Sequence, residues 1–223
     1  MKLTVKDLYD LTHTKAKEYL ERFIWPWEAL EGIPELILSL GQQLPADEYE
    51  HPERDIWIAK DAKVASSASI SGPCIIGHGT EIRQCAFIRG GALVGDGCVV
   101  GNSTELKNVI LFDEVQVPHF NYVGDSILGW LSHMGAGSVT SNVRADKQNV
   151  IIHNDGEEAA TGRMKVGAFL GDRVEIGCNS VLNPGTVVGH DSNIYPLSCV
   201  RGVVPENSIF KNDGTVVSKI KVI

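Results

Sequence analysis

A strict six-residue period runs through the middle of the chain and restricts its fold more than any other feature. Counting in sixes meets only aliphatic side chains: Ile58, Val64, Ile70, Ile76, Ile82, Ile88, Val94, Val100 and Leu106. Four residues after each of the first eight comes a small side chain: Ala62, Ala68, Cys74, Thr80, Ala86, Ala92, Cys98 and Thr104. This period fits neither an α-helix nor the simple alternation of one strand. It is typical of a hexapeptide β-helix, in which short parallel strands stack as coils.

The period slips after Leu106 and stops for a stretch before it resumes. Its next aliphatic positions are separated by five or six residues: Leu111, Val117, Val123, Leu128 and Met134. It resumes at Leu170, Ile176, Leu182, Val188, Ile194 and Val200. We predict an external hairpin excursion over residues 143–165, with its turn at Asn154-Asp155-Gly156. Slips re-aim side chains at the corners of the coils, so we expect the functional residues there.

Residues 1–52 lack the period and are predicted to form a helical N-terminal cap and linker. Thr4 and Asp7 have the spacing of a capping box at the start of a first helix. A cap over the first coil is expected, because the open end of a β-helix exposes unpaired backbone. A docking module, based on Trp25 and Trp27, is the alternative. The β-helix is predicted over residues 53–210, followed by a tail over residues 211–223, which makes the fold class all-β.

Composition excludes several classes of function. The formal net charge of −8 argues against nucleic acid and anionic membranes as partners. No apolar run is long enough to span a membrane, and the charged start Met1–Asp7 lacks the apolar core of a signal peptide. Five cysteines show no paired CxxC spacing, so we expect a reduced, cytoplasmic protein.

Three departures from the repeat carry residues that could do chemistry. The first is Val117–Asp125, which contains His119, and the second is Gly135–Asn142, with a Gly-Ala-Gly turn. The third is a basic cluster on and around the excursion: Arg144, Lys147, Arg163 and Lys165. Arg89 and Lys107 lie upstream, on coils that could stack beneath His119.

These motifs resemble the C-terminal acetyltransferase domain of the bifunctional N-acetylglucosamine-1-phosphate uridyltransferases. The archaeal-type sugar-1-phosphate nucleotidylyltransferase/acetyltransferases are closer still, because they share an excursion that ends in a run like Gly162–Phe169. The resemblance covers about residues 70 to 210. It implies a left-handed β-helix, a homotrimer with active sites between subunits, and acetyl-CoA as co-substrate. No metal is required for the acetyl transfer that it implies.

The resemblance also implies a role for each matching residue. His119 matches the general base that takes a proton from the amino group of an amino-sugar phosphate, with glucosamine 1-phosphate as the default acceptor. Histidine suits this role because its ordinary pKa lies near neutral pH. Arg89 and Lys107 match contacts to the phosphate. Tyr122, Asn142 and Lys147 match contacts to the sugar or its amine.

The resemblance places the co-substrate along a second set of residues. Ala136, in the Gly-Ala-Gly turn, matches a backbone N–H near the thioester carbonyl, where a donor would stabilise the oxyanion. Cys178 and Pro196 match positions that line the CoA arm, and Lys211 matches a contact to its phosphates.

The chain departs from the family at two points. His133 stands where the family has an asparagine among the sugar contacts, so it is included in the predicted substrate site. The glycine-rich opening loop of the nucleotidyltransferase domain has no counterpart here. Two other functions therefore stay open. One is a non-catalytic β-helix that assembles with or regulates a sugar nucleotidyltransferase. The other is a γ-type carbonic anhydrase, which needs three zinc-binding histidines between subunits.

Overall fold

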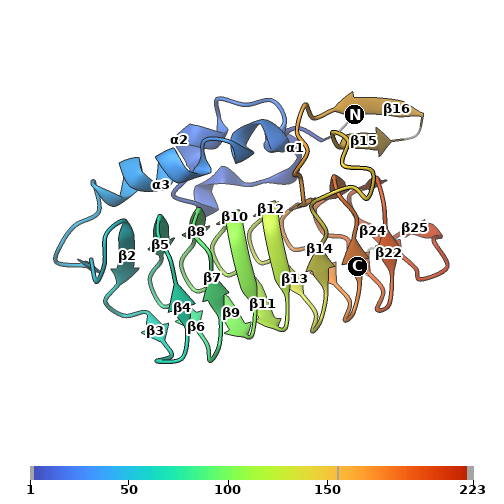
Figure 1. Ribbon diagram of the computed structural model, residues 1–223. Coiled ribbons are helices and arrows are strands. Elements are labelled where there is room, and N and C mark those ends of the chain that lie inside the picture. Colours follow the sequence, from blue (N-terminus) through green and yellow to red (C-terminus); the bar gives the residue numbers. More distant parts are fainter. Residues whose placement is uncertain (1–2, 155, 220–223) are drawn as a thin grey trace.

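A computed structural model describes residues 3–154 and 156–219 and shows a parallel β-helix with a helical segment along one side (Figure 1). The predicted fold class is therefore confirmed. Aliphatic residues of the period stack in register between successive coils: Ile76 pairs with Val94, Ile82 with Val100 and Ile88 with Leu106. Each is almost fully buried, because it points into the interior of the coil. The small positions lie at corners, where the Thr80 hydroxyl donates to the Gly95 carbonyl of the next coil.

The strands form three flat faces, which we call face 1, face 2 and face 3. Face 1 contains β2 (Ile56–Ala59), β5 (Cys74–Ile76), β8 (Ala92–Val94), the ends of β10 (Glu105–Leu111) and β12 (Tyr122–Leu128), β17 (Ala168–Leu170), β20 (Thr186–Val188) and β23 (Val203–Val204). Face 2 contains β4 (Ser69–Ile70), β7 (Phe87–Ile88), the beginnings of β10 and β12, β14 (Val139–Thr140), β19 (Val181–Leu182) and β22 (Cys199–Val200). Face 3 contains β3 (Lys63–Val64), β6 (Glu81–Ile82), β9 (Val99–Asn102), β11 (Gln116–His119), β13 (His133–Met134), β18 (Glu175–Ile176), β21 (Asn193–Ile194) and β24 (Ser208–Phe210).

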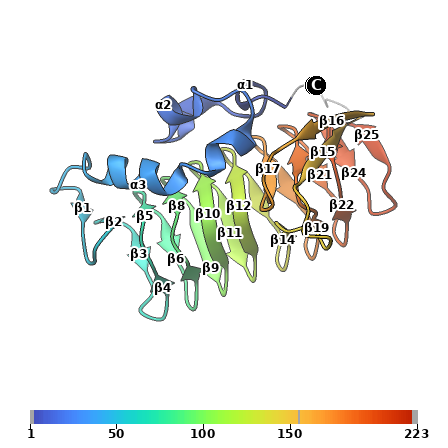
Figure 2. The same cartoon turned by 45° about the horizontal axis from the view of Figure 1, so that its top comes forward.

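The N-terminal segment is folded as five short helices. These are α1 (Val5–Leu8), the 3-10 helix η1 (Leu11–His13), α2 (Lys17–Leu20), the 3-10 helix η2 (Pro26–Leu30) and α3 (Ile33–Gly41). The capping box of Thr4 and Asp7 is present at α1, as predicted. Helix α3 packs against β5, β8 and β10, and η2 packs against β12. Figure 2 shows these helices lying lengthwise over face 1.

The position of this segment corrects the expectation of a cap over the first coil. The helices instead cover the outer side of face 1, where Leu93, Ile110 and Phe169 point outward and are at most 1% exposed. Trp27 is also buried, 6.1 Å from the Phe169 ring, and Trp25 stacks on it. The two tryptophans that suggested a docking module are thus part of the contact between the segment and the β-helix.

Short antiparallel strands cover one edge at each end of the β-helix. At the start, β1 (Tyr49–Glu50), from the predicted linker, pairs with β2. At the other end, β25 (Val216–Ser218), from the predicted tail, pairs with β24. Each added strand satisfies backbone groups that an open edge would expose.

The predicted excursion is present as a hairpin beside the later coils. Strand β15 (Ile151–Asn154) pairs antiparallel with β16 (Glu157–Ala160), which confirms the two arms. Asp155, in the predicted turn, lies outside the described residues. Val150 and Ile152 are buried and anchor the hairpin to the β-helix near Gly185. No helix among the described residues is long and apolar enough to cross a membrane.

An ion pair at the corner between faces 1 and 3 gives a pH-dependent contribution to stability. Arg173 donates from Nε and one Nη to the two Asp191 carboxylate oxygens, at 2.7 and 2.8 Å. The hydrogen bond from Arg173 is the main reason why the pKa of Asp191 is lowered to about 2. A lowered carboxyl pKa stabilises the fold above the unfolded-state pKa of about 3.9, and this stabilisation is lost as pH falls toward 2.

We expect Asp191→Asn to lower the free energy of unfolding by about 1 kcal/mol at pH 6. The full shift would give more, but the Arg173 side chain is 42% exposed and solvent screens the pair. Urea unfolding of both proteins at pH 6 and pH 3 measures this. Roughly half of the difference should be gone at pH 3. A difference that stays constant over this range would contradict the assignment.

Candidate active site

Two corners of the β-helix are each one residue shorter than the six-residue period requires. This shortening places a buried carboxylate at the end of face 2. Ile88 and Val94 are six residues apart, but Leu106 and Leu111 are five, as are Val123 and Leu128. Strands β10 and β12 therefore run from face 2 to face 1 without a loop. The corner residues Asn108 and Asp125 have positive φ angles of 55° and 48°. The predicted slips thus coincide with a change in backbone path.

Asp125 is the hub of this corner. Its side chain is 4% exposed, and Lys107 Nζ lies 2.9 and 3.3 Å from its two oxygens. It also accepts hydrogen bonds from Asn108 Nδ2 at 3.0 Å and from Asn142 Nδ2 at 2.6 Å. A buried carboxylate needs such partners, because an unpaired buried charge is costly. Asp125 lies within a motif of the sequence but was given no role there, since its partners come from two other coils.

Tyr122 and Asn142, two of the predicted substrate contacts, meet beside this hub. The Asn142 amide donates to the Tyr122 hydroxyl at 3.2 Å as well as to Asp125. Partial burial is the main reason why the pKa of the Tyr122 phenol is raised, so the phenol stays protonated near neutral pH. The Tyr122 ring folds over the backbone of Gly124, where a Cβ would lie 2.5 Å from the hydroxyl oxygen.

We expect Gly124→Ala to disturb the site more than the fold. The added methyl must displace the Tyr122 hydroxyl and the Asn142 amide, which would lie 2.5 and 3.0 Å away. A lost hydrogen bond of this kind typically costs about 1 kcal/mol, so KM for the acceptor should rise about fivefold to tenfold. Steady-state kinetics for the acceptor, measured beside a thermal melt, would check this and separate an effect on the site from an effect on the fold. An unchanged KM would show that the acceptor does not contact Tyr122.

Arg89 lies one coil before Lys107 on the same side. Arg89 follows Ile88 and Lys107 follows Leu106, and Ile88 and Leu106 are in register. The two basic side chains therefore project from adjacent coils. Arg89 is held by Glu105, with 2.7 Å between Nη1 and Oε1, and this pair raises the pKa of Arg89. Arg89 and Lys107 therefore approach one another, but each is already paired with a carboxylate.

His119 lies at the opposite corner of face 2, at the end of β11. Its side chain is exposed, and no described residue forms a hydrogen bond with its ring. Its backbone N–H donates to Asn121 Oδ1 at 3.1 Å, and its carbonyl accepts from Gly137. Three residues of extended chain separate His119 from Tyr122, at most about 10 Å. A sugar phosphate can cover this distance along face 2.

Asn121 joins the His119 corner to the Gly-Ala-Gly turn. It is 2% exposed, and its amide donates to the carbonyl oxygens of Gly135 and Ser138 at 2.9 and 3.1 Å. The same side chain accepts from His119, so it fixes the position of Ala136 relative to His119. This residue was missed from the sequence because only the coil-to-coil contact reveals its role.

The residues assigned to the co-substrate form a column with His119. Gln116 is in register with His133, so His119, three residues further, is level with Ala136. His133 is in register with Glu175, and Glu175 with Asn193, so Cys178 and Pro196 continue the column. Lys211, directly after Phe210 of β24, lies one coil beyond. The structure thus lines up Ala136, Cys178, Pro196 and Lys211 along one corner.

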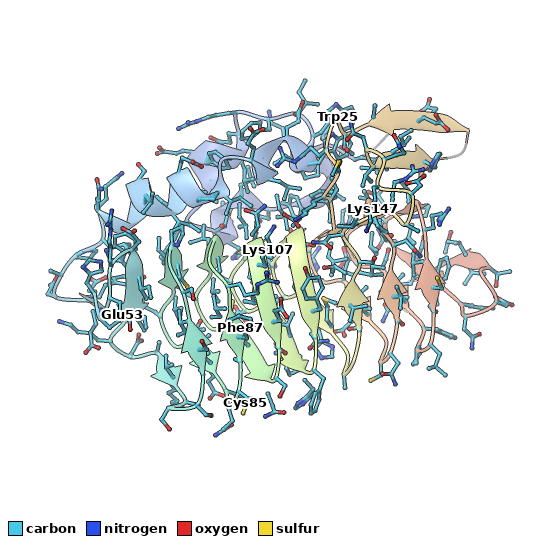
Figure 3. The ribbon with its side chains drawn as sticks, viewed as in Figure 1. Trp25, Glu53, Cys85, Phe87, Lys107 and Lys147 are labelled. Atoms are coloured by element: carbon cyan, nitrogen blue, oxygen red, sulfur yellow. The ribbon has the colours of Figure 1, made fainter. Side chains whose placement is uncertain are left out.

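Two predicted residues lie outside these groups. His133 faces outward on face 3, with its ring Nδ1 2.8 Å from Glu175 Oε2. Lys147 is exposed on the excursion, with a positive φ of 58°. Figure 3 shows Lys147 beyond the coil of β14, away from Lys107. Neither residue contacts the Asp125 hub.

A pocket of about 460 Å³ adjoins the hub where the excursion meets the N-terminal segment. We call it the corner pocket. It is lined by Leu30 and Glu31, by Lys107, Asn108 and Asp125, and by residues 162–165. Asn108 ties the segment down by donating to the Leu30 carbonyl at 3.1 Å. Two of the four basic residues around the excursion, Arg163 and Lys165, thus line the pocket beside the hub, whereas Arg144 pairs with Asp146 at 2.6 Å.

The histidine side chains of the described residues form no metal-binding cluster. No group of three or more His, Cys, Asp or Glu side chains with metal-binding geometry occurs within residues 3–154 and 156–219. His78, His133 and His190 each pair with carboxylates of their own neighbourhood.

Comparisons with known proteins point to enzymes that modify sugars. A family model described as the GMPPB C-terminal domain matches residues 70–212. A bifunctional sugar-1-phosphate nucleotidylyltransferase/acetyltransferase of Sulfurisphaera tokodaii is 34% identical over 156 residues, which are 70% of this chain and 39% of the relative. A putative uncharacterized acetyltransferase, YaiX, of Escherichia coli K12 is 28% identical over 78% of this chain and 74% of the relative. These relatives bear out the resemblance.

The chain spans much less than the full length of the bifunctional relatives. It covers 39% of the Sulfurisphaera protein and 33% of a bifunctional protein GlmU of Methanococcus maripaludis. Among solved structures, the acetyltransferase domain of PglB from Neisseria gonorrhoeae, in complex with acetyl coenzyme A, has 17% identity and a TM-score of 0.39. That likeness covers 71% of this chain and 55% of the other, and a score this low supports no conclusion about function.

Proposed function

The chain belongs to the GMPPB C-terminal domain family, and from this premise we propose that it transfers an acetyl group from acetyl-CoA to the amine of an amino-sugar phosphate. The observation that carries the proposal is the arrangement on face 2. The His119 ring, which has no hydrogen-bond partner among the described residues, stands at one corner, and Tyr122, Asn142 and Asp125, joined by hydrogen bonds, stand at the other. Glucosamine 1-phosphate is the default acceptor.

The chemistry needs a base and an oxyanion donor on the same side of the acceptor. His119 takes a proton from the amino group as the nitrogen attacks the thioester carbonyl carbon. The C–S bond then breaks, and the CoA thiolate leaves and takes up a proton. The Ala136 N–H, level with His119, would stabilise the oxyanion between these two steps. Asn121 holds the His119 backbone and the Gly-Ala-Gly turn at a fixed separation.

The co-substrate and the acceptor approach from different directions in this proposal. The pantetheine arm follows the column of Cys178 and Pro196 and brings the CoA phosphates toward Lys211. The sugar lies across face 2, with its hydroxyls at Tyr122 and Asn142 and its phosphate toward Arg89 and Lys107. His133 and Lys147 would reach the acceptor only from a neighbouring subunit. Because the helices cover face 1, we expect the subunit contacts of a homotrimer to lie on faces 2 and 3.

Release of free CoA thiol tests the proposal. The purified protein is incubated with acetyl-CoA and glucosamine 1-phosphate, galactosamine 1-phosphate or glucosamine alone. Release that depends on the acceptor and needs its phosphate supports the proposal and identifies the sugar. No release with any acceptor, from a folded protein whose oligomeric state has been measured, would favour a non-catalytic partner of a nucleotidyltransferase instead.

A further inference from the structure

The corner pocket gathers positive charge in a chain that is acidic as a whole. Lys107, Arg163 and Lys165 line it, although the net charge of the chain is −8. Of its two carboxylates, Asp125 is buried and already accepts from three side chains. Lys165 is exposed and forms no ion pair with another described residue. The accessible surface of the pocket therefore favours an anion.

Arg163 is the residue whose pairing can change. Its guanidinium lies 3.0 Å from Glu31 of the N-terminal segment, and its Nε is buried without a hydrogen-bond partner among the described residues. The Glu31 side chain is 86% exposed, whereas that of Arg163 is 27% exposed. An ion pair with so exposed a carboxylate contributes little stability. A phosphate, which matches the fork of an arginine in two hydrogen bonds, can replace it.

We propose that the corner pocket binds the phosphate group of the acceptor and that Glu31 competes with this phosphate for Arg163. The inference rests on the proposed function. It adds Arg163 and Lys165 to the phosphate site and makes Glu31, which lies outside the β-helix, a residue that sets acceptor affinity. The pocket is in the right place, because Asp125 connects Lys107 in its wall to Asn142, which contacts Tyr122. Figure 3 shows Lys107 on β10 on the side of the N-terminal segment.

Binding of inorganic phosphate tests the pocket without any turnover. The full chain is titrated with phosphate and followed by phosphorus NMR. Glu31→Gln removes the competitor and should tighten binding about twofold to fivefold. Arg163→Met should weaken phosphate binding about tenfold. Arg163→Lys keeps the charge but not the forked guanidinium, so its phosphate affinity should lie between those of Arg163→Met and the unchanged protein.

A matched pair on face 3 separates the pocket from a general effect of charge. Arg83 lies 3.1 Å from Glu81, and this pair is partly exposed as well. Glu81→Gln and Arg83→Met make the same charge changes away from the corner pocket and should leave phosphate affinity within experimental error. Equal effects of Glu31→Gln and Glu81→Gln would overturn the proposal, and so would an Arg163→Met variant that binds phosphate normally.

A competition experiment tests whether inorganic phosphate occupies the site of the acceptor's phosphate group. Inorganic phosphate should raise the apparent KM for the amino-sugar phosphate, and Glu31→Gln should lower that KM by the same factor by which it tightens phosphate. Phosphate that binds at Arg163 without competing would overturn the assignment to the acceptor. If no acetyl transfer is found but phosphate binding responds to Glu31 and Arg163, the proposed function fails while the anion site stands.

Discussion

His119→Ala lowers kcat for acetyl transfer by about 10²–10⁴-fold, which is the typical contribution of a general base. The proposed mechanism gives the proton of the attacking amine to this imidazole, so the variant lacks the base of the reaction. The free energy of unfolding should change by less than about 0.5 kcal/mol, because the side chain is exposed and its ring makes no hydrogen bond with a described residue. Initial rates at saturating acetyl-CoA, together with urea unfolding, measure both quantities.

His153→Ala is the matched control for this experiment. His153 is also exposed and lies on the hairpin, where its ring is 3.1 Å from Glu158. Its removal should leave kcat within a factor of two. The mechanism would be wrong if His119→Ala retained the kcat of the unchanged protein. If His153→Ala lowered kcat as much as His119→Ala, the loss would be a non-specific effect of removing a histidine.

Asp125→Asn should be the most damaging single change near the site. The new amide group places a donor among the donors of Lys107, Asn108 and Asn142, and it leaves Lys107 without its counter-charge. Breaking a pair with a buried member costs about 3 kcal/mol of unfolding free energy. We also expect kcat/KM to fall by at least about tenfold, since the amide keeps only one acceptor oxygen, which cannot serve both Asn108 and the Asn142 amide that contacts Tyr122.

A double-mutant cycle measures the interaction between Lys107 and Asp125 separately from the other hydrogen bonds of Asp125. Lys107→Met alone leaves the Asp125 carboxylate without its cation, whereas Lys107→Met with Asp125→Asn removes both charges. The double variant should be more stable than the sum of the single losses predicts, because no unpaired charge remains. Additive losses would show that Lys107 and Asp125 do not interact in solution. Asp61→Asn, on an exposed carboxylate that pairs with His78, serves as the control and should leave the free energy of unfolding nearly unchanged.

The coils could be read from the sequence because the signal is local and repeated. An inward aliphatic and a small corner residue recur in every turn, and a displaced register would point the aliphatic side chains outward. A second sequence pattern also distinguishes the face that the helices cover. Face 1 strands are fully buried triplets such as Cys74–Ile76 and Ala92–Val94, with an apolar residue at the outward position. Such a run predicts that another element covers the face.

The sequence predicted the helices of the N-terminal segment but not the face of the β-helix that they cover. Its caps, such as Thr4 with Asp7, are decided by neighbours in sequence. Its docking depends on contacts such as Trp27 with Phe169, which lie far apart in the chain. Terminal capping of a β-helix is a sound general expectation, but here β1 and β25 perform it.

The β-helix, the excursion and the residue types that could do chemistry follow from local patterns, because a period of six and a motif are properties of neighbouring positions. Which of these residues meet depends on the tertiary structure. It aligned His119 with Ala136, made Asp125 and Asn121 the residues that hold each corner, and set Glu31 against Arg163. The physical reason is that such contacts join different coils or the helical segment. A shortened corner or a packed helix changes them without changing the repeat.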